Sequence, residues 1–348
     1  MHNRINADTG ENPESSGLTR RAWCGRTGRL ALAGLCATVT RAAAAPATAP
    51  AVRAIADGLW WIEGAPGDTT ATNRGTISSL LACRDGRRLW LVGSGPSPAA
   101  GRRLARALQE HTGQAVTDVI SPWPRPELVL GLSAWPAARH WAHAEVAAAM
   151  RTRCPGCVER LRLRLGDAAA DLGADPVVVP TRLVQGERGA LGPWRWWRLS
   201  RGHDTPVTVW MLPSARLVTA HGLLWGDGPP DLRDADGPVV RTALNRLQAL
   251  APDPRWRWLP EQGPLLPATA PTAHAAYLDA LVQTVTATQS QGGLETDPPA
   301  PPAGLADAHP AAAVRHALNW QHVWRETETA LFDDALPQRP GAFQRSLR

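Results

Sequence analysis

The sequence of 348 residues contains no lysine, so arginine supplies all 37 of its basic side chains. Against 31 acidic residues these give a net charge of +6, but no run of about five or six like charges occurs. The composition therefore argues against nucleic acid as a partner, because proteins that bind it concentrate basic residues in patches. Aromatic residues other than tryptophan are scarce, with one tyrosine and two phenylalanines against 16 tryptophans. We interpret the tryptophans as packing residues, with stacking on an aromatic ligand as the alternative.

Long apolar runs are also absent, and the run near the N-terminus is short. Thr19–Cys24 (TRRAWC) holds a twin arginine, followed by GRLALAGLCATV and by alanines at 43–45. This order is typical of a twin-arginine export signal, and the run is too short to span a bilayer. We expect residues 1–46 to form a disordered N-terminus and cleaved signal peptide, and the mature protein to be periplasmic without a transmembrane anchor. An amphipathic N-terminal helix is the alternative.

Only five cysteines occur, and two of them, Cys24 and Cys36, lie in the predicted signal. Cys83 lies in a predicted strand and reads as a buried thiol. Cys154 and Cys157 form RCPGC, for which an oxidising compartment favours a local disulfide. The alternative is a redox pair at the start of the following helix, where a thiolate would be stabilised. Two thiolates alone supply half of a tetrahedral zinc site.

The order of the predicted elements favours an α/β protein. Helical periodicity predicts five helices. The first of them has Ser97 as its N-cap and Gly113 as its stop signal. The predicted helices are 97–113, 138–152, 238–250, 272–289 and 311–336. Alternating or buried apolar runs predict strands at 52–62, 74–83, 87–95, 116–120, 176–180, 194–199, 207–212, 216–221 and 256–265. This order suits two sheets flanked by helices, a four-layered sandwich. A C-terminal helical extension, 272–348, follows and contains a Gly/Pro-rich linker at 290–310.

Four segments, in this order, resemble the motifs of the metallo-β-lactamase fold of zinc hydrolases. LWLVGSGPS stands where the family has a strand ending in Asp-Thr-Gly, and VISPWPRPELVLG where it has Thr-His-x-His-x-Asp-His. LSRGHDTPVTVWMLPSARLVTAHGLLWGD matches its Gly-x-His turn and later Gly-Asp, and WLPEQGPL its Pro-Gly-His-Gly. The resemblance covers residues 52–268 and implies the αββα sandwich of that family. The export signal, the cysteine pair and HALNWQHVWRETE are similar to the subgroup of quinoprotein relay system zinc metallohydrolases.

The metal positions of that family are mostly replaced in this chain. They fall on Trp123, Arg125, Glu127, Leu128, His203, Gly222 and Gln262, and the early structural aspartate falls on Gly93. His203 is retained, and Glu127 keeps a carboxylate. Zinc requires three or four lone-pair donors, whereas tryptophan and arginine only donate hydrogen bonds and leucine does neither. The resemblance therefore implies vestigial ligand positions, with no catalytic residue, no cofactor and no metal-activated water.

Two questions about these residues stay open at the level of sequence. Arg125 either pairs with Glu127 and holds the loop shut, or binds a carboxylate or phosphate together with His203 and Gln262. Independently, His203, Glu127 and His221 offer a rearranged mononuclear zinc site, which would make the protein an active hydrolase. We favour a non-catalytic binding or accessory protein, with a periplasmic protein or a small anion as its partner. A link to a quinoprotein dehydrogenase system rests on the resemblance alone.

Overall fold

The computed structural model describes residues 49–202, 204–302 and 309–335. The predicted signal at 1–46 and the candidate ligand His203 lie outside the described residues. No helix in the described part of the chain is long and apolar enough to cross a membrane.

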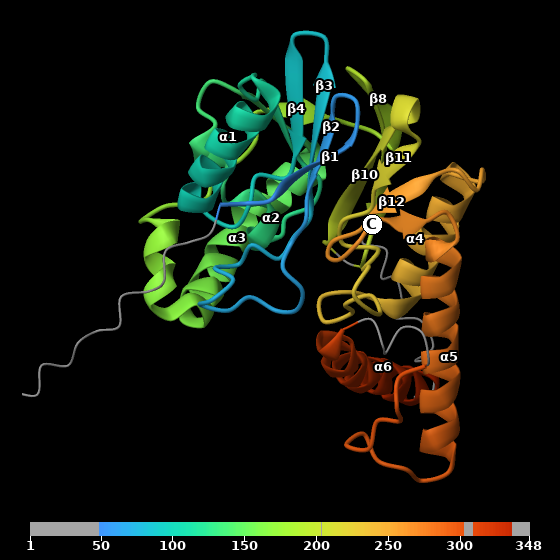
Figure 1. Ribbon diagram of the computed structural model, residues 1–348. Helices are drawn as coiled ribbons and strands as arrows, with labels where there is room; N and C mark the ends of the chain where they lie inside the picture. The colour runs from blue at the N-terminus through green and yellow to red at the C-terminus, as the bar shows by residue number, and fades with distance from the viewer. Residues whose placement is uncertain (1–48, 203, 303–308, 336–348) are drawn as a thin grey trace, which may run out of the picture. The chain divides into compact units, whose positions relative to one another are not determined.

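The strands form two sheets (Figure 1). The first sheet has the order β1-β2-β3-β4-β5-β6-β7, antiparallel up to β4 and parallel from there on. Its strands are β1 Val52–Ala56, β2 Leu59–Ile62, β3 Leu80–Asp85, β4 Arg88–Val92, β5 Asp118–Ser121, β6 Arg139–His143 and β7 Arg182–Val184. The second sheet has the order β13-β12-β11-β10-β9-β8, with a parallel β11–β12 pair. Its strands are β8 Arg188–Leu191, β9 Trp194–Ser200, β10 Pro206–Leu212, β11 Leu217–Thr219, β12 Arg257–Leu259 and β13 Leu266–Pro267.

The alternation of side chains along the strands builds separate apolar layers. Trp90 of β4 packs between the sheets in one cluster with Trp194 and Trp210 of the second sheet. Its neighbours Leu89 and Leu91 belong to the cluster that also contains the helices, because successive residues of a strand face opposite sides. Most of the described tryptophans are buried, which confirms the packing interpretation.

Helices cover the outer faces of both sheets (Figure 1). α1 Pro98–Thr112 and α3 Ala144–Leu165 lie on the first sheet, α4 Gly237–Leu250 lies on the second, and α5 Ala270–Ser290 packs against α4. The predicted ends of α1 are confirmed: the Ser97 side chain accepts a hydrogen bond from the Ala100 amide, and Gly113 ends the helix at φ 69°. The arrangement is the expected four-layered sandwich.

Some local predictions were wrong, because pairing within the sheet outweighs local propensity. The predicted helix at 138–152 begins instead as strand β6, which pairs in parallel with β5, and the helix continues through the cysteine pair to Leu165. The histidines at 140 and 143 therefore lie on a strand, and His143 caps α3. Residues 176–180 form no strand, and the strand predicted at 74–83 begins only at Leu80.

The C-terminal helix α6, Pro310–Ala335, packs on the fold. It contacts α5 (Figure 1), and Trp320 and Val323 of α6 are buried. The Asn319 side chain makes two hydrogen bonds to the backbone of the loop before α4. It accepts from the Leu232 amide at 3.0 Å and donates to the Pro230 carbonyl at 2.6 Å. The helix is thus an integral part of the structure, which the sequence left undecided.

Candidate anion-binding site

The loop after β5 carries the first group of positions that the resemblance predicts to be vestigial metal positions. Thr208 of β10 fixes its start, since both the amide and the hydroxyl of Thr208 donate to the Pro122 carbonyl, at 2.8 and 2.9 Å. Pro126 then begins the short helix α2, Pro126–Val129, because proline is favoured at the first helical position. The loop thereby presents Trp123, Arg125 and Glu127 at the carboxyl end of the strand.

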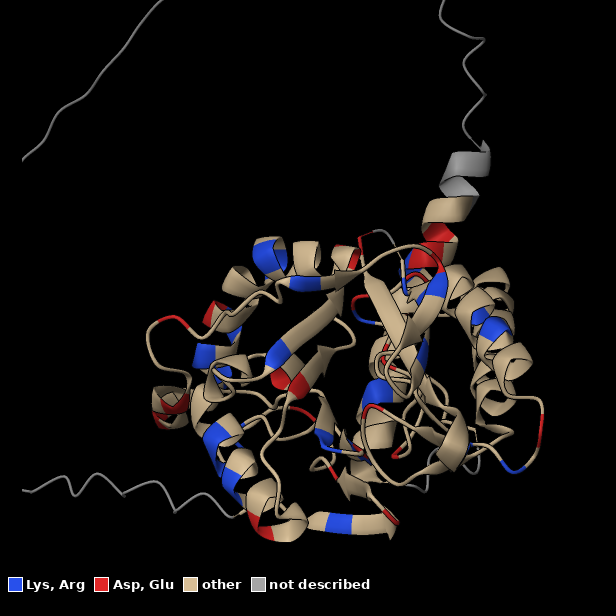
Figure 2. Cartoon of the chain, turned by 90° about the horizontal axis from the view of Figure 1, so that it is seen from above, with Lys and Arg blue, Asp and Glu red and all other residues tan. Residues whose placement is uncertain are grey.

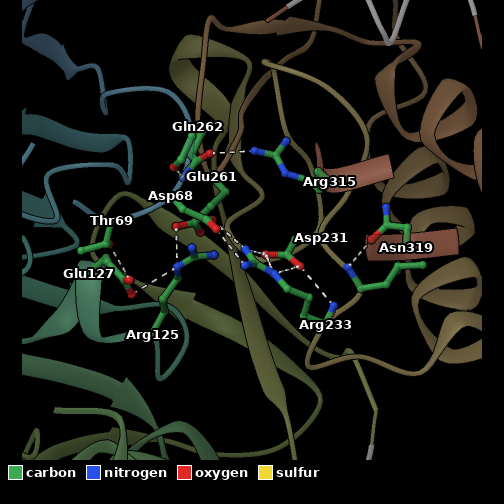
Figure 3. Close-up of polar contacts among 12 residues, drawn as sticks. Asp68, Thr69, Arg125, Glu127, Asp231, Arg233, Glu261, Gln262, Arg315 and Asn319 are labelled. Atoms are coloured by element: carbon green, nitrogen blue, oxygen red, sulfur yellow. Dashed lines mark hydrogen bonds and ion pairs between the residues drawn. The ribbon is translucent and has the colours of Figure 1, made fainter. Parts of the chain in front are cut away.

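Arg125 is held between two carboxylates (Figure 3). Its Nε lies 3.4 Å from Glu127 Oε2 and 3.7 Å from Glu261 Oε1. Burial disfavours the charged guanidinium, but these two carboxylates raise the pKa of Arg125 above its ordinary value. The predicted pairing of Arg125 with Glu127 is confirmed.

Glu261 is the centre of this cluster and was not predicted from the sequence. Its side chain is fully buried, and it accepts hydrogen bonds from Trp123 Nε1 at 3.0 Å, from the Gly222 amide at 3.2 Å and from the Ser78 hydroxyl. Its two oxygens thus have three hydrogen-bond donors, and the Arg125 guanidinium lies at ion-pair distance. The sequence feature that could have indicated Glu261 is that it directly precedes Gln262, a predicted ligand position.

The two glycines at vestigial positions are fixed by packing. At Gly93 an added Cβ would lie 2.5 Å from Leu80 Cδ2 and 2.6 Å from Leu128 Cδ1. At Gly222, where φ is +76°, it would lie 3.1 Å from the Trp123 ring and 3.2 Å from Arg201 Cδ. The space that an aspartate would need at either position is therefore filled by side chains.

Gln262 is bound within the protein. Its Nε2 donates to the Gly67 carbonyl at 3.0 Å, and its Oε1 accepts from Arg315 of α6 at 3.0 Å (Figure 3). The side chain is buried and does not line the pocket at the loop. In the alternative anion site of Arg125, His203 and Gln262, Gln262 is therefore not a lining residue of this pocket and supports α6 instead, while His203 lies outside the described residues.

The described residues do not fit a zinc ion. Glu127 is bound by Arg125 and by the Thr69 hydroxyl at 2.8 Å. His221 is fully buried with Nε2 2.7 Å from the Ser79 carbonyl, and burial lowers its pKa. In the described part of the chain, no group of three His, Cys, Asp or Glu side chains is arranged to hold a metal. The fixed charge of Arg125 also repels a dication.

A pocket of about 360 Å³ opens beside the loop. Its lining has six arginines and three acidic residues, and charges of both signs are otherwise interspersed over the chain (Figure 2). The charged lining residues are Arg125, Glu127, Arg153, Arg160, Arg164, Arg201, Asp231, Arg233 and Asp234. A volume of this size accommodates a small molecule, and the excess of arginine favours an anionic one.

Arg233 is neutralised within this lining. It pairs with Asp231 at 2.7 Å and with Asp68 at 2.8 Å (Figure 3). Burial opposes ionisation of Asp231, but its hydrogen bonds with Arg233 lower its pKa below the ordinary range. The charge of Arg233 is thus balanced without a ligand.

Cys154 and Cys157 are free thiols, so the expected disulfide is not formed in the structure. Both lie inside α3, where residues three apart hold their Cβ atoms about 5–6 Å apart, beyond the roughly 3.5–4.5 Å of a disulfide. Burial raises the pKa of Cys154 to about 12 and also raises that of Cys157. The alternative of a redox pair at a helix N-terminus was therefore wrong as well.

Comparisons with known proteins agree with the fold. No protein-family model matches the sequence, and no curated protein is significantly similar to it. Among solved structures, the metallo-β-lactamase of Hirschia baltica matches with a TM-score of 0.52 and 12% identity, over 66% of this chain and 98% of that one. FIM-1 of Pseudomonas aeruginosa, in its mono-zinc form, matches with a TM-score of 0.53 and 16% identity, over 68% and 97%. The enzyme of Pontibacter korlensis matches with a TM-score of 0.52 and 15% identity, over 66% and 99%. The chain therefore has the metallo-β-lactamase fold.

Proposed function

We propose that this chain is a non-catalytic binding protein on a metallo-β-lactamase fold. The observation that carries the proposal is the cluster in which Arg125, Glu127 and Trp123, at vestigial metal positions, contact one another and Glu261. Each carboxylate in it is already bound by protein donors. Zinc binding would have to displace these donors and to tolerate a guanidinium at contact distance, which electrostatics strongly disfavours.

Export and a partner belong to the same proposal and are supported by the sequence alone. TRRAWC supports twin-arginine export to the periplasm. The cysteine pair and the segment HALNWQHVWRETE support a role beside a quinoprotein dehydrogenase system. Since α6 contains that segment and packs on the fold, its buried side chains serve stability.

Hydrolysis provides the test of the non-catalytic assignment. We expect the mature protein to hydrolyse neither β-lactams nor esters, whether it is assayed after dialysis against a chelator or with added zinc. The reason is that no metal-activated water forms without a metal site. Zinc-dependent turnover that disappears in both Glu127→Gln and His221→Ala would contradict the proposal and would support the rearranged mononuclear site.

A further inference from the structure

Arg201, which directly follows β9, has a buried guanidinium without a counter-charge of its own. The side chain is 2% exposed and lines the pocket. One of its terminal nitrogens donates to the backbone carbonyl of Asp231, whereas its Nε is buried without a hydrogen-bond partner. No carboxylate of the described residues lies within ion-pair distance of Arg201; the charges of Asp231, Asp234 and Glu261 act on it from farther away, and the carboxylate of Asp231 is bound to Arg233. Burial lowers the pKa of Arg201 to about 10.

The surroundings of Arg201 compensate its charge only in part, because burial outweighs the nearby carboxylates. Its guanidinium lies 4.7 Å from the ring centroid of Trp123 and 5.5 Å from that of Trp225. Such contacts stabilise a cation only partly, and an unpaired buried charge is strongly unfavourable. The other arginine buried in the lining, Arg125, has two carboxylates. Arg201 therefore differs from it in a way that points to a ligand.

The mouth of the same pocket is also basic. Arg160 and Arg164 of α3 line it and are exposed, and neither has an ion pair with a described residue. Arg160 donates to Cys157 Sγ at 3.0 Å. The Trp123 ring, 5% exposed and in contact with two guanidinium groups, offers no free face for stacking. Recognition at this site is thus electrostatic.

We infer that Arg201 binds the oxyanion group of a small organic acid, a phosphate ester or a carboxylate, whose remaining part extends between Arg160 and Arg164. This inference rests on the proposed binding function and names its ligand class. An oxyanion in the pocket supplies the counter-charge that no described carboxylate provides at ion-pair distance, and charge-assisted hydrogen bonds to guanidinium are among the strongest in proteins. The exposed arginines at the mouth attract the anion and add affinity that salt screens.

The test is calorimetric titration of the mature protein at low ionic strength with inorganic phosphate, phenyl phosphate and benzoate. At least one of the three is expected to bind, and its head group distinguishes a phosphate ester from a carboxylate as the ligand.

Arg201→Gln is expected to weaken binding by about 10–100-fold. Arg164→Gln is expected to weaken it by a few-fold, as is usual for an exposed charge. Arg241→Gln is the matched control, because Arg241 pairs with Asp279 on α4 and α5 outside the pocket, and it is expected to bind like the parent.

A merely structural role for Arg201 makes a different prediction. Without ligand, Arg201→Gln is expected to unfold at the temperature of the parent or higher, because an unpaired charge is removed. Added phosphate should raise the unfolding temperature of the parent and not that of the variant. If Arg201→Gln does not fold, the double variant Arg160→Gln/Arg164→Gln tests the mouth instead. The inference is overturned if no probe binds more tightly than chloride at matched ionic strength, or if the folded variants bind as tightly as the parent. Neither result bears on metal binding or hydrolysis, so the non-catalytic assignment is tested by separate experiments.

Discussion

Replacing Glu261 with glutamine is expected to lower the free energy of unfolding by about 3–5 kcal/mol. The carboxylate is fully buried and accepts from Trp123, Gly222 and Ser78 while facing Arg125. Glutamine keeps the size of the side chain but removes its charge. Its amide NH2 group is a donor and faces protein groups that are donors themselves. Urea denaturation monitored by tryptophan fluorescence measures the change.

Glu187→Gln is the matched control for this experiment. Glu187 pairs with Arg198 at 3.3 Å, but its side chain is 69% exposed, so its loss is expected to cost about 1 kcal/mol at most. Equal effects of the two substitutions would show that the cluster around Arg125 does not organise the loop.

Replacing Arg315 with methionine is expected to have a comparable effect, about 3–5 kcal/mol. Arg315 joins α6 to the fold through Asp227 at 3.0 Å and Gln262 at 3.0 Å, and the side chains of this ion pair are 6% and 4% exposed. Its removal leaves the carboxylate of Asp227 buried without a cation. We expect α6 to become sensitive to proteases before the rest of the domain unfolds, which limited proteolysis and urea denaturation together detect.

Two further variants distinguish loss of the buried ion pair from loss of side-chain packing as the cause of the destabilisation. Arg325→Met removes a pair with Glu295 whose arginine is 69% exposed, and it is expected to change stability by less than about 1 kcal/mol. The double variant Arg315→Met/Asp227→Leu should recover part of the lost stability, because no unpaired charge remains. Failure of the double variant to recover any stability would mean that packing, rather than charge, explains the loss.

The sequence predicted the layers of this fold better than its local details. Apolar runs in segments such as 87–95 and 207–212 predicted β4 and β10, because a strand buried on both faces reads as a near-continuous apolar run. The strand β6 was mistaken for a helix, since RHWAH precedes an alanine-rich helix and its pairing with β5 is a tertiary effect. The cysteine pair was predicted as a disulfide because proline and glycine in RCPGC suggested a break, but α3 extends through both cysteines.

The site was predictable only where its residues are close in the sequence. Arg125 and Glu127 lie in one loop, so their pairing could be expected. Glu261, Arg201 and Arg315 reach the same region from distant segments, and the sequence contains no signal that brings them together. The unpaired state of Arg201 depends on what surrounds it in space, so the alternative anion site predicted from the sequence contained Arg125, His203 and Gln262 but not Arg201.

Metal content tests the central claim most directly. The mature protein, purified from the periplasm without chelators, would be analysed by mass spectrometry for bound metals, in parallel with His203→Ala. We predict zinc far below one equivalent in both proteins, because Arg125 stands at a predicted metal position and is paired with the carboxylates of Glu127 and Glu261. Near-stoichiometric zinc in the parent that disappears in His203→Ala would contradict the account and would identify a rebuilt metal site.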